Sequence, residues 1–146
     1  CDVSSDLCSS NLIGRKDGPG RTPAWIRKYI FPGGYAPALS EVLPVLERQH
    51  LWVTDIEILR LHYALTLDRW QARFAQNRAE VAKLYDERFC RMWEFYLISA
   101  EMMFETGGQH VFQMQLTRRV DGAPIVRDYI TDTQRRYREA EARAPA

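Results

Sequence analysis

The sequence predicts a mostly helical domain with about two β-strands, and three patterns support this fold class. Residues 110–118 alternate strictly between apolar and polar side chains, which is the period of a strand. Residues 51–59 form a second strand candidate, and residues 81–103 carry apolar side chains three or four positions apart, as an amphipathic helix does. Two strands alone do not make a stable sheet. We therefore expect them to be added strands of a sheet whose remainder lies outside this sequence.

The composition is that of an ordinary globular domain. The chain has 146 residues, with 46% hydrophobic and 27% charged side chains, which excludes a disordered or collagen-like protein. No apolar stretch approaches the roughly 20 residues that span a bilayer. The formal net charge of +1 argues against strong nucleic-acid binding.

Arginine dominates the basic residues. Lys16, Lys28 and Lys83 are the lysines among 20 basic residues, so the other 17 are arginines. Arginine prefers forked contacts with phosphate and carboxylate, which leaves a phospholipid or nucleic-acid partner conceivable. GC-rich codon usage is the favoured explanation, because acidic residues are interleaved with the arginines instead of being segregated from them.

The first part of the chain is predicted to be rich in loops, with one short helix. Residues 1–10 are polar and nonperiodic, and residues 14–22 contain three glycines and a proline. Thr22 is the expected N-cap and Pro23 the expected first residue of the helix. The segment 31–34 should end this helix, because its proline and two glycines force a turn.

Further elements follow from the periodicity of the remaining chain. Ser40 is expected to cap a short helix that ends near Gln49, ahead of the strand at 51–59. The expected faces of this strand carry Thr54, Ile56 and Ile58 on one side and Asp55 and Glu57 on the other. Residues 126–143 should form an exposed terminal helix.

Two helices are predicted between the strands. The first has the apolar stripe Tyr63, Leu67, Trp70 and Phe74. The second has the stripe Val81, Tyr85, Phe89, Met92, Tyr96, Ala100 and Met103. Gly107 and Gly108 should end the second helix.

No catalytic constellation can be assembled from motifs alone. The sequence has no phosphate-binding glycine loop and no metal-binding pair of histidines, so no metal site is predicted. For the histidines, a structural or exposed role is favoured over metal binding. For Asp55 and Glu57, a solvated strand face is favoured over an acid–base pair. The aromatic side chains can line a channel for a long apolar ligand, although an ordinary helical core is favoured.

The spacing of the cysteines predicts no particular site. Cys1, Cys8 and Cys90 are an odd number without a CxxC motif, which predicts neither a disulfide framework nor a zinc site. A reducing cytoplasm is the default location for such a chain.

Three segments together carry a family resemblance. They are Trp25-Ile26-x-x-Tyr29-Ile30-Phe31-Pro32-Gly33-Gly34-x-x-Pro37, then His62-Tyr63-x-x-Thr66-Leu67-x-x-Trp70, then Arg91-Met92-Trp93-x-x-Tyr96-Leu97. In this order and spacing they resemble the C-terminal part of the cyclopropane-fatty-acyl-phospholipid synthase (mycolic acid cyclopropane synthase-like) family. The resemblance covers residues 12–130 and only about the last third of a family member.

The resemblance implies an α/β fold of the S-adenosylmethionine-dependent methyltransferase type, with antiparallel final strands and inserted helices that cap a lipid site. It implies transfer of a methyl(ene) group from S-adenosylmethionine to a cis double bond of a phospholipid acyl chain. In the family a bound bicarbonate removes a proton from the added methyl group, and the ring closes. The intermediate that loses this proton is the carbocation formed by methyl transfer, and some relatives hydroxylate or otherwise modify this cation, so the resemblance does not fix the product.

The resemblance also implies site residues. Tyr63 is expected to be catalytic and to hydrogen-bond the bicarbonate, since a phenol is a neutral donor that leaves the anion basic. Ile13 corresponds to a position whose backbone contacts bicarbonate, and Asn11 stands where the family has a bicarbonate-binding histidine. An amide cannot carry a charge or move a proton at neutral pH.

The acyl pocket is expected near Phe31, Pro32, Gly33 and Gly34. The same four residues can equally be read as a helix-breaking turn.

Cofactor-binding residues are expected to be absent from this chain. The glycine-rich cofactor loop and the ribose-binding acid of the family would lie before residue 1, so the cofactor-binding Rossmann half is missing. Residues 4–10 are poor strand material where the family has an apolar strand. We therefore expect a truncated, frame-shifted or excised piece that binds neither S-adenosylmethionine nor bicarbonate alone and is inactive alone, which leaves its status as an enzyme open.

The expected organisation is an atypical segment 1–11, a methyltransferase part 12–130 and an exposed charged tail 131–146. Expected partners are phospholipid acyl chains and the membrane surface, met peripherally at the cytoplasmic side of an inner membrane, without nucleic acid and with a homodimer left open. Two alternatives remain: a non-catalytic helical interaction module, and a surface-binding protein that uses its arginines.

Overall fold

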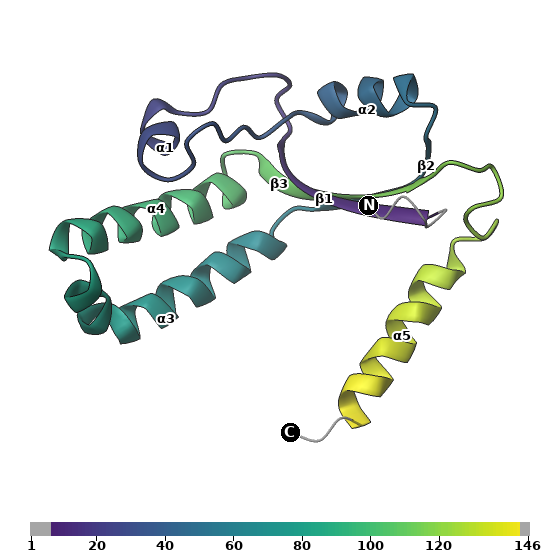
Figure 1. The fold of residues 1–146 in the computed structure, drawn as a ribbon. Helices are drawn as coiled ribbons and strands as arrows, with labels where there is room; N and C mark the ends of the chain where they lie inside the picture. Colours follow the sequence, from purple (N-terminus) through teal and green to yellow (C-terminus); the bar gives the residue numbers. More distant parts are fainter. Residues whose placement is uncertain (1–6, 144–146) are drawn as a thin grey trace.

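The computed structural model describes residues 7–143 and places a small sheet between helices (Figure 1). Its elements in chain order are β1 (Leu7–Arg15), α1 (Ala24–Tyr29), α2 (Leu39–Arg48), β2 (Trp52–Leu59), α3 (His62–Leu84), α4 (Glu87–Glu105), β3 (Gln109–Thr117) and α5 (Asp128–Arg143). Figure 1 shows α2 over one face of the sheet, α3 and α4 as a hairpin beyond one end, and α5 leading away from the other.

The sheet has three antiparallel strands in the order β1-β3-β2, so the expectation of about two strands was wrong. The missing one is β1, which covers residues expected to be poor strand material and the start of an expected loop. Its whole length pairs with β3, from Leu7 opposite Thr117 to Arg15 opposite Gln109. Tertiary pairing with a strongly alternating neighbour overrides the weak strand propensity of its serines. Residues 7–11 of the expected atypical segment thus belong to the sheet, and residues 1–6 lie outside the described residues.

One face of the sheet forms a dry core beneath α2. Phe112, Met114 and Leu116 of β3 are 0%, 2% and 5% exposed. Apolar side chains from the neighbouring strands and from α2 and its C-terminal end pack on them: Cys8, Leu12, Leu39, Val42, Leu46, Leu51 and Ile56. The alternation that predicted β3 is the alternation of this core.

The opposite face of the sheet carries polar side chains where it meets the start of α5. Arg127 forms an ion pair with Asp55 of β2, and the Tyr129 hydroxyl donates to the side-chain oxygen of Gln115 on β3. The rest of α5 has no buried residue, which confirms the predicted exposed terminal helix. Residues 144–146 of the expected tail lie outside the described residues.

A second core lies within the α3–α4 hairpin. Its buried members are Ala64, Leu67, Tyr96, Leu97 and Phe104. The boundary between the helices differs from the prediction, since α3 runs to Leu84 and the expected single stripe is split at Tyr85. Asp86 starts α4, because its carboxylate accepts the N–H of Phe89 at 2.6 Å.

Around α1, the predicted turn at residues 31–34 is present, but the predicted N-cap at Thr22 is not. Gly34 donates its N–H to the Phe31 carbonyl at 2.9 Å, and Gly33 has φ 79°, as a type II turn with Pro32 requires. Thr22 does not cap α1, because its hydroxyl donates to the Gly34 carbonyl at 2.7 Å. The helix therefore begins at Ala24, after Pro23.

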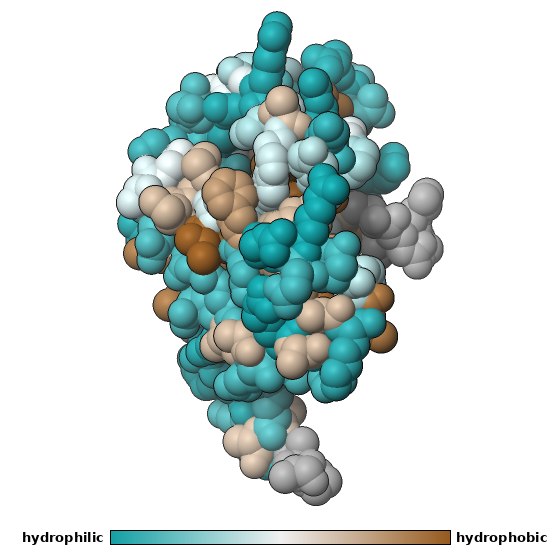
Figure 2. All heavy atoms as spheres, turned by 90° about the vertical axis from the view of Figure 1, so that its left-hand side faces the viewer, coloured by the Kyte–Doolittle hydropathy of each residue, from teal (hydrophilic) through white to brown (hydrophobic). Residues whose placement is uncertain are grey.

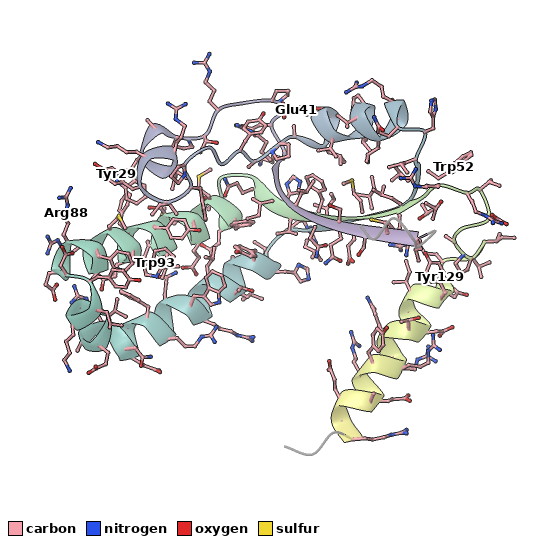
Figure 3. All side chains as sticks on the ribbon, in the orientation of Figure 1. Tyr29, Glu41, Trp52, Arg88, Trp93 and Tyr129 are labelled. Carbon is pink, nitrogen blue, oxygen red and sulfur yellow. The ribbon has the colours of Figure 1, made fainter. Side chains whose placement is uncertain are left out.

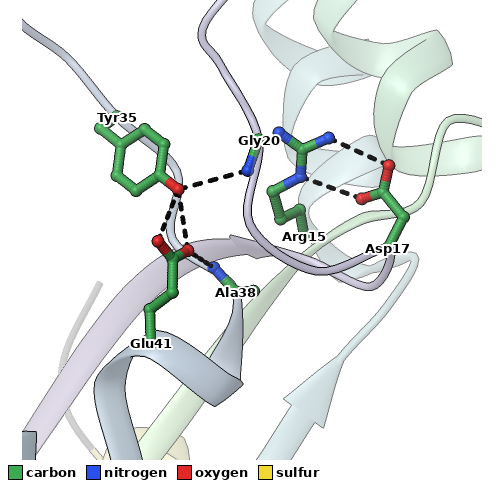
Figure 4. Close-up of polar contacts among 6 residues, drawn as sticks. All are labelled: Arg15, Asp17, Gly20, Tyr35, Ala38 and Glu41. Atoms are coloured by element: carbon green, nitrogen blue, oxygen red, sulfur yellow. Dashed lines mark hydrogen bonds and ion pairs between the residues drawn. The ribbon is translucent and has the colours of Figure 1, made fainter.

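The start of α2 also differs from the prediction, as Figure 4 shows. The helix begins at Leu39 and its N-cap is Ala38 instead of Ser40. Glu41 accepts the Ala38 N–H at 2.8 Å and the hydroxyl of Tyr35 at 2.8 Å. A side chain from within the first turn thus performs the expected role of a cap, and it ties the preceding loop to α2.

Candidate functional site

Tyr63 lies where the sheet meets the helical hairpin. It is the second residue of α3, four positions after the end of β2, and it is half-buried. Its ring lies 4.8 Å from the Phe104 ring and 6.1 Å from the Trp70 ring, measured between centroids. The Tyr63 hydroxyl has no hydrogen-bond partner within residues 7–143, so its donor can serve a ligand.

Tyr96 of α4 is a second phenol in this cluster. It is 8% exposed, and burial raises its pKa, with a further rise from the nearby Tyr63. Both effects disfavour the phenolate, so Tyr96 is a neutral donor at ordinary pH. Sequence reasoning quoted Tyr96 in a motif but gave it no role, and the periodic stripe indicated only that it faces a core.

Of the four expected acyl-pocket residues, Phe31 contacts this aromatic cluster. Its ring meets Tyr96 edge-to-face at 5.8 Å, although the side chain is 51% exposed. Gly33 and Gly34 instead line a separate hollow of about 360 Å³ together with loop residues that include Arg21. Pro32 is exposed in the turn.

Ile13 lies within reach of the hairpin through one intermediate residue. It stands opposite Val111 in the β1–β3 register, and Val111 packs against the hairpin core that Tyr63 also joins. Ile13 itself is 39% exposed. Ile13 is therefore paired in the sheet with Val111, which packs against the same core as Tyr63.

Asn11 stands in a polar row across the open face of the sheet. It pairs with Gln113, which pairs with Glu57 on the far strand. Its side chain is exposed and has no hydrogen bond within the described part of the chain. The structure therefore places Asn11 on the same face as Ile13, two residues further along β1 from the hairpin.

The other ionisable candidates do not converge. Within residues 7–143 no three His, Cys, Asp or Glu side chains lie close enough to hold a metal ion. His110 is buried beside Phe112, with 5.9 Å between their rings, and Asp55 is held by Arg127. Cys90 is a buried free thiol.

Cys8 is disulfide-bonded, a single bond that the predicted absence of a disulfide framework did not anticipate. A pattern of three cysteines without CxxC spacing carries no signal for that bond. No helix among the described residues is long and apolar enough to cross a membrane.

Comparisons with known proteins give a consistent result. The profile of a family described as mycolic acid cyclopropane synthetase matches residues 8–114. Tuberculostearic acid methyltransferase UfaA1 of Mycobacterium tuberculosis is 43% identical over 105 residues, which is 70% of this chain and 24% of that protein. The cyclopropane-fatty-acyl-phospholipid synthase of Escherichia coli is 32% identical over 111 residues, which is 76% of this chain and 29% of that protein.

The fold is likewise similar to part of a solved enzyme. The crystal structure of mycolic acid cyclopropane synthase CmaA1 complexed with SAH and CTAB matches with a TM-score of 0.69 and 25% identity. The match covers 76% of this chain and 44% of that one. The chain thus spans about a quarter of the length of these two curated relatives and under half of the solved one.

Proposed function

The chain belongs to the mycolic acid cyclopropane synthetase family, and we propose that it supplies the C-terminal, acyl-binding part of a lipid methyltransferase. The family membership confirms the resemblance that the three sequence motifs indicated. The activity proposed for the whole protein is transfer of a methyl(ene) group from S-adenosylmethionine to a cis double bond of a phospholipid acyl chain. The position of Tyr63 in an aromatic cluster, with an unpartnered hydroxyl, is the observation that carries this proposal.

Tyr63 fits the role of an anion-binding donor. Bicarbonate, when bound in such an enzyme, supplies the base. The half-buried Tyr63 hydroxyl would donate a hydrogen bond to it. The raised pKa of Tyr96 keeps this second phenol protonated, so Tyr96 does not compete as a base. Asn11 and the backbone of Ile13 are the further residues proposed to hold the anion.

The aromatic rings fit a reaction that passes through positive charge. The rings of Phe104, Trp70 and Phe31 lie around the two tyrosines, and aromatic faces attract cations. The same rings exclude water from an acyl chain that lies among them. Phe31, Pro32, Gly33 and Gly34 are proposed to form the mouth of this acyl pocket.

Asn11 is the residue that most separates this chain from its family. The resemblance gives a histidine at this position, and a neutral amide holds an anion more weakly than a group that can carry positive charge. We expect Asn11→His to raise turnover wherever the segment works in an intact enzyme.

The described residues do not fit S-adenosylmethionine binding on their own. Binding of such a cofactor uses a glycine-rich turn between a strand and a helix N-terminus. In residues 7–143 the helix that follows β1 starts nine residues later and is only six residues long. We expect titration calorimetry of residues 1–146 with S-adenosylmethionine to show no micromolar binding, and such binding would contradict this part of the proposal.

The activity is tested in a chimaera. Residues 8–114 would replace the matching segment of the Escherichia coli synthase, and label from methyl-labelled S-adenosylmethionine would be followed into unsaturated phospholipid. We expect labelled lipid, and Tyr63→Phe should lower kcat about tenfold or more while lipid binding is unchanged. Tyr85→Phe is the matched control, because Tyr85 is 66% exposed and lies away from the cluster.

Two outcomes would contradict the proposal. A chimaera that folds and binds the cofactor but leaves the lipid unlabelled would exclude the proposed activity of this segment. Equal turnover of the Tyr63→Phe chimaera and its parent would remove Tyr63 from the mechanism.

The expected partners remain proposals. We propose phospholipid acyl chains as substrate and peripheral association with the cytoplasmic side of an inner membrane. Nucleic acid is not among the proposed partners, and a homodimer is left to a light-scattering measurement.

A further inference from the structure

A groove of about 520 Å³ lies between α1 and the first half of α4. Its apolar walls come from Trp25, Tyr29, Phe89, Met92 and Phe95. Figure 2 looks onto the end of the molecule that carries α1 and the α3–α4 turn, and apolar side chains gather there within a hydrophilic surround. Figure 3 shows Tyr29 and Arg88 at the same end, reaching it from different helices.

The apolar surface continues from the groove along the outer side of α4. Phe95, Ile98 and Met102 follow each other at helical spacing and are 58%, 50% and 57% exposed. They form a stripe on the side of the helix that faces away from the hairpin core. A continuous exposed stripe of this kind marks a binding surface, whereas single exposed apolar residues do not.

Unpaired basic side chains border the same surface. Arg27 and Lys28 lie in the last turn of α1, and Arg88 and Arg91 lie in the first turns of α4. None of these four forms an ion pair within the described part of the chain, although several other arginines do.

The acidic groups nearby are already engaged. Asp86 carries one negative charge while it accepts the Phe89 N–H, and Glu87 and Glu94 share Arg78, so these acidic groups are fewer than the basic ones. The groove rim is therefore locally cationic on a chain whose formal net charge is only +1. An anionic surface complements this rim.

We propose that the face formed by α1 and α4 docks on an anionic phospholipid bilayer. Trp25 and Tyr29 would lie at headgroup level, the α4 stripe would reach the acyl boundary, and Arg88 and Arg91 would contact phosphates. A nucleic acid would use the cations but would leave the Phe95–Met102 stripe in water, so a bilayer fits both features of this surface.

The docking face and the candidate site share the hairpin core. Trp25 meets Phe95 edge-to-face at 4.9 Å in the groove, and it also packs against the hairpin core that includes Tyr96. Phe31, two residues after α1, contacts Tyr96 from the same segment. A bilayer held on this face would thus present its acyl chains to the Tyr63 cluster. The inference rests on the proposed function only in linking the bilayer to the substrate.

The test is vesicle flotation of residues 1–146. We expect the chain to float with vesicles that contain phosphatidylglycerol, to release them as salt is raised, and to leave pure phosphatidylcholine vesicles mostly unbound. Arg88→Gln with Arg91→Gln should weaken binding at least tenfold. Arg118→Gln with Arg138→Gln is the control, since it removes the same charge from exposed residues elsewhere and should change binding less than twofold.

A second measurement needs no charge substitution. Brominated lipids quench tryptophans that enter the bilayer, and we expect Trp25→Phe to remove most of the quenching seen with the unsubstituted chain. Absence of flotation, equal weakening by both arginine pairs, or quenching that survives Trp25→Phe would each overturn the proposed face. The assay involves no methyl transfer, so its failure leaves the chimaera result standing, and an inactive chimaera leaves the docking result standing.

Discussion

The two cores of this molecule differ in what surrounds them. The core beneath α2 is built from aliphatic and aromatic side chains of β3 that are at most 5% exposed, and it has no phenol among its members. The hairpin core contains Tyr96 and is edged by Tyr63, Trp25 and Trp93, with a groove and an exposed stripe on its outer side. Figure 3 shows Trp93 reaching from α4 into the space between the two hairpin helices.

This difference separates stability from ligand binding. Tight packing of apolar side chains has little to offer a ligand, so the sheet core holds the fold. The hairpin core combines hydrogen-bond donors, aromatic faces and partial exposure, which are properties of a binding site. Mutations in the two regions should therefore separate a loss of folding from a loss of binding.

The largest effect is expected at Phe112. This side chain is 0% exposed at the centre of the sheet core, and Phe112→Ala should lower the free energy of unfolding by about 3–5 kcal/mol. Phe31→Ala removes the same side chain from the hairpin side, where Phe31 is 51% exposed, and should cost much less. Urea denaturation followed by circular dichroism measures both. Equal losses for the two variants would erase the distinction between the cores.

A smaller loss is expected from an added methyl group at Gly14. A Cβ at this position would lie 2.3 Å from a Phe112 ring atom and 3.0 Å from the Pro37 carbonyl oxygen. Gly14→Ala should therefore destabilise the chain by about 1–3 kcal/mol through overpacking. Ser9→Ala, an exposed change in the same strand, is the control. An unchanged urea midpoint for Gly14→Ala would show that this contact yields without cost.

The stability of the α3–α4 hairpin is tested by removing the N-cap of α4. Asp86→Ala takes away the acceptor for the Phe89 N–H at the start of α4 and should cost about 1 kcal/mol. Amide hydrogen exchange should speed up in the first turn of α4 and stay unchanged in β3. Asp68→Ala on the exposed side of α3 should alter neither. Faster exchange across the sheet would mean that the two regions unfold as one.

The smallest effect concerns the ion pairs that join α3 to α4. Arg78 contacts Glu87 at 2.8 Å and Glu94 at 2.7 Å, and its hydrogen bond lowers the pKa of Glu87 below the ordinary value of 4.5. A depressed carboxyl pKa stabilises the fold above pH 4.5, and this contribution is lost as the pH falls through the folded-state pKa.

Arg78→Gln should therefore lower Tm at neutral pH by a modest amount that shrinks as the solution is acidified. Thermal melts at several pH values measure this trend. Arg69→Gln, an exposed arginine of α3 without an ion pair among the described residues, should leave Tm and its pH dependence unchanged. A Tm difference that stayed constant down to acid pH would exclude the carboxylates as its cause.

Periodicity predicted the elements whose own side chains alternate strongly. It failed where pairing or capping by other residues determines the secondary structure. The apolar alternation of residues 110–118 and the Pro-Gly turn after Phe31 are local signals, and both appear in the structure. The apolar stripe that predicted one helix continues past Asp86, but Asp86 caps the start of α4, so the predicted boundary between the two helices was wrong. The strand β1 was missed because its serines gain strand structure only by pairing with β3.

The candidate site shows the same division. Family motifs in the sequence singled out Tyr63 and Phe31 as candidates, but they gave no reason for the two to be near each other. The packing of α3 on α4 brings Tyr96 between them, and register alone places Ile13 and Asn11 on the open face of the sheet.

By itself, the sequence determined the family and most of the helices and strands, because motif spacing and hydrophobic period are local properties of the chain. The third strand, the close approach of Gly14 to Phe112 and the basic rim of the α1–α4 groove were decided by tertiary structure. The physical reason is that strand pairing, overpacking and unpaired charge depend on residues far apart in the chain, whose distances no local pattern encodes.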